Sequence, residues 1–237
     1  MKTCLRLGGI VVASAAIFGS LAFAEEAKSE SQATFVDPDS AEAKPYRDVG
    51  DRSIDRLAMT MITDAAGAVS RGTEVAALPN CHLKDVPMKD GTVGGLPRIT
   101  AVKVTSAKLR NPENAPDAGE QAALEKYRIG IELGSPPKLL VQRVDLPNGA
   151  KEWRVYKPLV YIRQCGTCHA RADEQSTELR TAIAAKYPKD EGTGYSAGQW
   201  RGLIRVTVAE PKAVPAAQPA APAKVEPPAK GVRSKKS

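Results

Sequence analysis

Residues 165–169 of the chain read Cys-Gly-Thr-Cys-His, a Cys-x-x-Cys-His motif in the C-terminal third of the sequence. In a helical turn, two thiols three residues apart lie on one side, and His169 lies close to Cys165. This spacing lets both sulfurs add to the vinyl groups of one porphyrin while the imidazole reaches the iron. The motif therefore predicts one covalent haem c at Cys165 and Cys168, with His169 as an iron ligand.

Three other interpretations of the motif stay open at this point. A thiol–disulfide redox pair is typical of a βαβ pattern with a low-pKa cysteine at a helix start, and no such pattern is visible here. A structural disulfide across two intervening residues would close a small ring and add little loop entropy. A zinc site could use Cys165, Cys168 and His169 together with Cys81 and His82, which supplies enough sulfur and nitrogen ligands for a tetrahedron.

The first 24 residues have the pattern of a signal peptide. Lys2 and Arg6 precede an apolar run of small residues, and Ala22-Phe23-Ala24 has the small-x-small form of a cleavage site. The apolar run is too short for a lasting membrane helix. The sequence therefore predicts export to the periplasm or secretion, with residues 1–24 removed and no lasting membrane anchor.

Cleavage would also remove Cys4, because it precedes the apolar run and is not placed as a lipoprotein anchor. Three of the four cysteines would then remain, of which a haem c uses two. Cys81 is then left as an unpaired thiol in an exported protein, and such a thiol usually has a specific role.

The formal net charge of +7 arises from the two ends of the chain. Lys2 and Arg6 belong to the signal peptide, and the segment from Pro211 onward is rich in lysine. Basic and acidic residues are equal in number between residues 25 and 210. The charge is therefore no sign of a nucleic-acid partner, and export argues against one as well.

Periodicity and turn signals divide the chain into an extended lead-in at 25–50, one domain at 51–210 and a disordered Ala/Pro/Lys tail at 211–237. Asp117 and Glu120 form the D-x-x-E signal of a helix start, and Asn148-Gly149 between two apolar runs predicts a hairpin. Gly91–Gly95 is interpreted as a turn-rich connector. The remaining predictions are a helix from Asp51 or Ser53 to Gly72, strands at 99–105, 129–133, 139–144 and 202–208, and helices through Tyr127 and at 178–186.

Several short strings in the chain resemble a family of single-haem c-type cytochromes with a PAS-like fold, formerly catalogued as a domain of unknown function. The likeness covers about Asp51 to Val208, and Gly119 departs from it where the family prefers a tryptophan. The strings are Arg110-Asn111-Pro112-x-Asn114-x-Pro116, Tyr156-x-Pro158, Tyr187-Pro188-x-Asp190, Gly194-Tyr195, Gly198 and Arg201-Gly202.

The resemblance implies an α+β fold, a PAS-like antiparallel sheet with flanking helices and one covalent haem. It also implies that a cysteine after the first helix is the second protein ligand of the iron, which here is Cys81. His82 is the alternative ligand, since bis-histidine ligation is common among c-type cytochromes. Haem propionates need cationic partners, and Arg110 and Arg201 lie within the family-like strings, although either is equally interpreted as a solvated surface arginine.

Two functions follow as expectations. The chain would act as a redox or small-ligand sensor that signals through a separate partner protein, or as a periplasmic electron-transfer cytochrome. A zinc-binding structural protein is a further alternative. No acid–base set typical of an enzyme such as a peroxidase is found.

Overall fold

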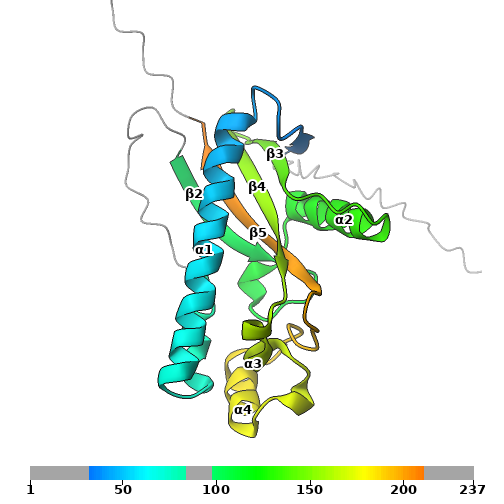
Figure 1. Cartoon of the computed structure of the whole chain (residues 1–237). Coiled ribbons are helices and arrows are strands. Elements are labelled where there is room, and N and C mark those ends of the chain that lie inside the picture. Colours follow the sequence, from blue (N-terminus) through cyan, green and yellow to red (C-terminus); the bar gives the residue numbers. More distant parts are fainter. Residues whose placement is uncertain (1–31, 84–97, 211–237) are drawn as a thin grey trace, which may run out of the picture. The chain divides into compact units, whose positions relative to one another are not determined.

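The structure is a computed structural model that describes residues 32–83 and 98–210 (Figure 1). The predicted signal peptide, the connector at 91–95 and the predicted tail at 211–237 lie outside the described residues. Within the described ranges, no helix combines the length and the apolar character needed to cross a membrane.

The strands of the described residues form one antiparallel sheet in the spatial order β1–β3–β4–β5–β2 (Figure 1). β3 and β4 are joined by the hairpin predicted at Asn148-Gly149, where Leu146 donates its N–H to the carbonyl of Ala150. Gly149 has φ +76°, a conformation that glycine adopts without a steric penalty. The strands are β1 (Gln32–Val36), β2 (Arg98–Thr105), β3 (Leu140–Asp145), β4 (Lys151–Val160) and β5 (Trp200–Ala209).

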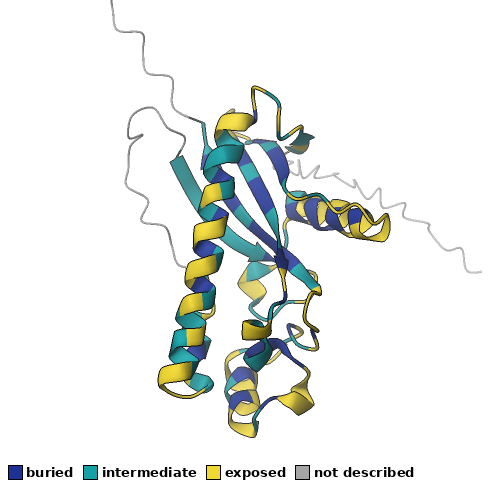
Figure 2. Cartoon of the chain, in the orientation of Figure 1, coloured by how far each residue is buried: buried dark blue, intermediate teal, exposed yellow. Residues whose placement is uncertain are grey.

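Successive residues of a strand point to opposite sides of the sheet, so both of its faces carry apolar side chains. One helix covers each of these faces. α1 packs Ile54 and Leu57 against Val155 and Val206 on one face. α2 packs Leu124 and Tyr127 against Tyr156 and Leu203 on the other. The central strands are consequently buried (Figure 2). The α+β class predicted from the sequence is confirmed for the described residues.

The helices of the described residues gather around the sheet and at one of its ends. They are α1 (Lys44–Arg71), α2 (Ala118–Glu132), α3 (Gly166–His169) and α4 (Thr177–Lys186), with short 3₁₀ turns η1 (Val75–Asn80), η2 (Pro112–Asn114), η3 (Arg163–Cys165) and η4 (Ala172–Glu174). The predicted helix at 178–186 and the predicted strands at 99–105, 139–144 and 202–208 are confirmed to within two residues.

The lead-in predicted at 25–50 is wrong where the structure describes it. Residues 32–36 form the edge strand β1, which pairs with β3, and α1 begins at Lys44 rather than near Asp51. Pro45 in the first turn suits a helix start, since its missing N–H has no intrahelical partner there. Tyr46 stacks on the buried Trp153 with ring centroids 4.6 Å apart. Packing therefore determines the start of this helix.

The strand predicted at 129–133 is also wrong, because α2 continues through these residues. Its start is as predicted: the Asp117 carboxylate accepts the N–H of Glu120, and the Glu120 carboxylate accepts the N–H of Asp117. Ile129 and Ile131 alternate like strand residues but lie exposed on the helix, and the exposed Leu133 is the residue that caps its end.

Candidate haem site

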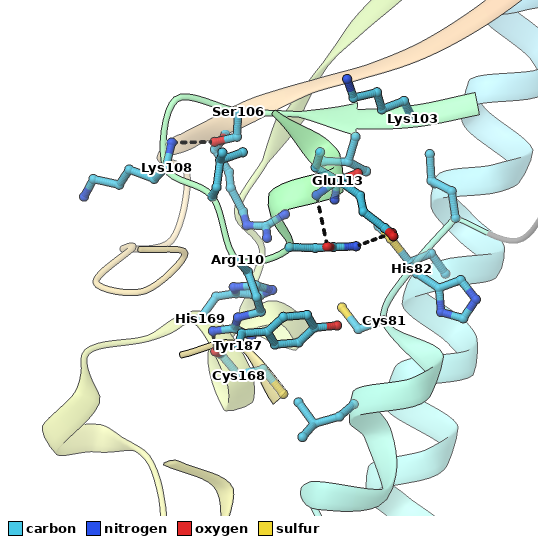
Figure 3. Close-up of a pocket in the computed structure, with 18 of the residues that line it drawn as sticks. Cys81, His82, Lys103, Ser106, Lys108, Arg110, Glu113, Cys168, His169 and Tyr187 are labelled. Atoms are coloured by element: carbon cyan, nitrogen blue, oxygen red, sulfur yellow. Dashed lines mark hydrogen bonds between the residues drawn. The ribbon is translucent and has the colours of Figure 1, made fainter. Parts of the chain in front are cut away.

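A cavity of about 600 Å³ lies at the end of the sheet where α3 and α4 are attached (Figure 3). Its size is within the range of about 300–1,000 Å³ that cofactor sites usually have. Its walls come from α1 at Met61, the η1 segment, β2 and the loop that follows it, α3, the end of α4 and the start of β5. The residues that matter below are Cys81, His82, Arg110, Cys168, His169 and Arg201, and all of them line it.

The Cys-x-x-Cys-His motif forms η3 and the single turn α3, as its spacing predicts. This turn buries Cys168 and His169, and Cys168 packs against Leu179 and Ile183 of α4. Cys165 is only half-buried and is not among the cavity-lining side chains. It is nonetheless near enough to Cys81 to contribute to raising the pKa of that thiol.

His169 is held in one orientation by the backbone around it. Its Nδ1 lies 2.6 Å from the carbonyl oxygen of Gly192, and since a carbonyl only accepts, Nδ1 carries the hydrogen. Nε2 is then the nitrogen with a free lone pair. The side chain is 3% exposed. Burial, together with the charges of Arg201 and Arg110, lowers the pKa of His169 well below its usual range, so the imidazole is neutral, as a metal ligand must be.

The main chain of the motif is fixed by the segment that follows α4 and by Gln175, which precedes α4. Tyr195 donates its N–H to the carbonyl of His169 at 3.1 Å, and Gly194 donates to the carbonyl of Ala170 at 3.1 Å. The Gln175 amide donates to the carbonyls of Cys168 and Ala170 at 3.3 and 3.1 Å. The motif therefore lies in a rigid setting rather than on a free loop.

Cys81 reaches the cavity from a different wall. It follows η1 directly, and Figure 3 shows its sulfur pointing toward the side of His169, while the imidazole of His82 points away from it. The exposed surface of Cys81 faces the cavity. Surrounding protein still desolvates the thiol and raises its pKa, so the free thiol is protonated at neutral pH.

Arg201 brings a positive charge to the cavity. Its Nε is buried and has no hydrogen-bond partner among the described residues, and its guanidinium lies over the ring of Tyr195 at 5.9 Å. Ser106 holds the position by donating its hydroxyl to the carbonyl of Arg201 at 2.7 Å. Gly202 has φ +157° and lies so close to the carbonyl of Thr105 that no side chain fits there.

Arg110 also lines the cavity, but its guanidinium is already engaged. It forms a two-pronged ion pair with Asp190 and donates to the carbonyl of Cys168 at 2.7 Å. The described lining as a whole is basic, with Lys103, Lys108 and Lys186 in addition to the two arginines against Glu113. An anionic group is therefore the electrostatically suited occupant.

The arrangement does not support the alternative interpretations of the motif. Within residues 32–83 and 98–210, no three Cys, His, Asp or Glu side chains gather closely enough to hold one metal ion, whereas zinc needs four ligands. Cys81, Cys165 and Cys168 are all free thiols. Burial raises the pKa of Cys168 to about 11, opposite to the lowered value that a redox-active thiol requires.

Sequence reasoning missed the roles of Asp190 and Gly192. Asp190 pairs with Arg110, and Gly192 accepts the hydrogen of His169. The one available signal was the Tyr187-Pro188-x-Asp190 string, which marks the segment but not its partners. Met61 lines the cavity as well, while Met59 is 65% exposed and away from any core.

Comparison with known proteins relates the chain to one family. Residues 87–209, more than half of the chain, match the family model described as Tll0287-like. Among solved structures, the chain is similar to the crystal structure of the cyanobacterial heme-protein Tll0287, with 22% sequence identity and a TM-score of 0.37. That similarity covers 48% of this chain and 63% of the other, less than two thirds of its length. No curated protein matches the chain.

Proposed function

The chain belongs to the Tll0287-like family, and we propose that it binds one haem c covalently through Cys165 and Cys168. The observation that carries the proposal is that His169 and Cys81 reach one cavity from different walls, next to the Cys-x-x-Cys-His turn. His169 would bind the iron through Nε2, and Cys81 would be the second protein ligand, with His82 as the alternative. When bound, the haem would supply one-electron redox chemistry and an iron that can bind a small ligand.

The cavity fits this group in size and in the charge of its lining. Haem carries two propionates, and the buried Nε of Arg201 has no described partner, so Arg201 is suited to hold one of them. Arg110 also lines the cavity, but its guanidinium is already engaged by Asp190. We further propose a PAS-like fold, which the five-stranded antiparallel sheet with flanking helices supports.

Within this proposal, the protein acts as an exported redox or small-ligand sensor. The raised pKa of Cys81, caused by desolvation, means that this sulfur takes up a proton whenever no metal holds it. Cys81 directly follows η1, which adjoins α1, the helix that packs along β4 and β5. A change at Cys81 could thus be transmitted to the sheet, which gives a sensor the two-state element that it needs.

An electron-transfer cytochrome is the second candidate, and it requires that the imidazole of His82, which points away from His169 in the structure, turn toward it. His82 also lines the cavity, and an iron held by His82 and His169 would keep both ligands in both redox states. In either role the protein would lie in the periplasm or be secreted, would need a separate redox or signalling partner protein, and would bind no nucleic acid.

A denaturing gel stained for haem tests the central proposal. The full chain is produced in a host with haem-attachment machinery, alongside Cys165→Ala/Cys168→Ala and the control Cys81→Ala. We expect haem staining to stay with the wild type and with Cys81→Ala, because neither loses a thioether, and to vanish in the double variant. Stoichiometric zinc and no staining in the wild type would refute the proposal.

A further inference from the structure

We propose that Asp190, held by Arg110, is a positioning residue that fixes the hydrogen-bond acceptor of His169 and thereby sets how strongly His169 donates to the iron. The effect on the iron rests on the proposed function, because it requires a bound haem. The effect on the orientation of His169 does not, because the hydrogen bonds that fix it are formed by the chain itself. It assigns to Arg110 a role different from propionate binding.

The ion pair between Arg110 and Asp190 is nearly excluded from solvent. Nε of Arg110 donates to Oδ1 at 3.1 Å, and the terminal nitrogen donates to Oδ2 at 2.9 Å. The two side chains are 11% and 9% exposed. Two parallel hydrogen bonds fix the carboxylate in direction as well as in place, and breaking such a buried pair from one side leaves a charge without compensation.

The same carboxylate controls the residue that contacts His169. Oδ1 of Asp190 accepts the N–H of Gly192 at 2.8 Å, and the carbonyl of Gly192 then accepts from Nδ1 of His169 at 2.6 Å. A Cβ on Gly192 would lie 3.1 Å from the Cβ of Arg110 and 3.1 Å from Oδ1 of Asp190. Gly192 is thus held by a hydrogen bond on one side and by close packing on the other.

Arg110 ties this segment to the motif at a second point. Its guanidinium donates to the carbonyl of Cys168, directly before His169, at 2.7 Å. The backbone adds a further link, since Glu191 donates its N–H to the carbonyl of Leu109 at 2.7 Å. One arginine therefore fixes both His169, through Cys168, and the acceptor of His169, through Asp190.

This arrangement has a chemical consequence for His169. A fixed acceptor on Nδ1 selects the tautomer whose Nε2 can bind metal, and a strong hydrogen bond there makes Nε2 a better electron donor. A better donor stabilises the oxidised metal and lowers its reduction potential. Partners of this kind matter in general, because their removal weakens metal binding or activity by about 10- to 100-fold.

Two measurements on the full chain test the proposal. Nitrogen-resolved NMR of the haem-free chain gives the tautomer of His169, whose signals need only be told apart from those of His82. Redox titration of the haem-loaded chain gives its midpoint potential. The variants are Asp190→Ala, Asp190→Asn and Arg110→Lys. Asp117→Asn is the matched control, since it makes the same change in an ion pair with Arg154, away from the cavity.

We expect Asp190→Ala to reduce the share of the Nδ1–H tautomer and to shift the midpoint potential upward. Asp190→Asn should give a smaller shift, because its amide oxygen still accepts the N–H of Gly192, and Arg110→Lys should also shift it upward, because lysine cannot make the two-pronged contact. Asp117→Asn should leave both quantities at their wild-type values.

A purely structural role would look different. If the Asp190 variants lower the melting temperature but leave the tautomer and the potential where Asp117→Asn leaves them, the proposal is overturned. If Asp190→Ala is not recovered in folded form, the tautomer and the midpoint potential of Asp190→Asn are compared with those of Asp117→Asn in the same way, and unchanged values overturn the proposal. A wild type that carries no haem refutes the proposed function instead, and the NMR measurement still tests the positioning of His169.

Discussion

Gly50 of α1 lies so close to Val155 of β4 that a Cβ added to the glycine would be 2.5 Å from the Cβ of the valine. This contact sets how near α1 can approach the sheet, and α1 carries Met61 to the wall of the cavity. The close approach of helix and sheet therefore depends on the absence of a side chain at position 50.

Gly50→Ala is expected to destabilise the protein. Alanine favours a helix over glycine by about 1 kcal/mol, but overpacking against the short, stiff side chain of Val155 costs about 1–3 kcal/mol. Gly67→Ala on the same helix is the control. Its Cβ would meet only the mobile end of Arg71, so this change should be neutral or stabilise by up to about 1 kcal/mol. Chemical denaturation measures both, and equal effects would contradict the packing argument.

Asp117 is expected to make stability depend on pH in the acid range. Burial alone would raise its pKa, but the N–H of Glu120 and the charge of Arg154 outweigh burial and lower it. A carboxylate with a lowered folded-state pKa stabilises fully above its unfolded pKa of about 3.9, and this contribution is lost as the pH falls through the folded-state pKa.

Asp117→Asn should therefore cost less than about 1 kcal/mol at pH 7, since the side chain is 45% exposed and asparagine caps a helix as well as aspartate does. The difference from the wild type should shrink toward zero below the folded-state pKa. Urea titrations at neutral and acid pH measure it. A cost that is the same at both pH values would contradict the assignment.

How much of the structure the sequence predicts depends on how local the cause is. The Asn148-Gly149 hairpin and the Asp117 cap are confirmed because both are fixed by neighbouring residues. The strand predicted at 129–133 is wrong because Ile129 and Ile131 alternate without being buried, and the helix begun at Asp117 simply continues.

In the cavity, too, the features fixed by neighbouring residues could be predicted and those fixed by distant contacts could not. The turn at Cys165–His169 follows from local spacing, and the structure places Cys81 beside the same cavity. The partner of Arg110 could not be predicted, because Asp190 lies 80 residues away in sequence. The start of α1 at Lys44 likewise depends on the stacking of Tyr46 on Trp153, a contact between distant segments.

The chain beyond Glu210 is expected to be dispensable, because its Ala/Pro/Lys composition cannot form a core. Removing residues 211–237 should leave the haem content and the melting temperature unchanged. Glu210 itself accepts the indole N–H of the fully buried Trp153 at 3.0 Å. Glu210→Ala is therefore the contrast, and it should cost about 1–3 kcal/mol by leaving a buried donor unpaired. A large loss on truncation alone would place the domain boundary further along the chain.

Cys81 and His82 can be told apart by replacing each with alanine. A thiolate is an anionic, strongly donating ligand that favours ferric iron, so Cys81→Ala should change the ferric spectrum, raise the midpoint potential and alter CO binding to the ferrous form. His82→Ala should leave all three unchanged, because its imidazole points away from the side of His169 in the structure (Figure 3). The two variants lie next to each other in sequence, so each is the control for general damage to the η1 segment. If His82→Ala alters the three quantities and Cys81→Ala does not, the thiolate ligand is refuted and the electron-transfer role becomes the better proposal, because a site held by two histidines would keep its ligands in both redox states.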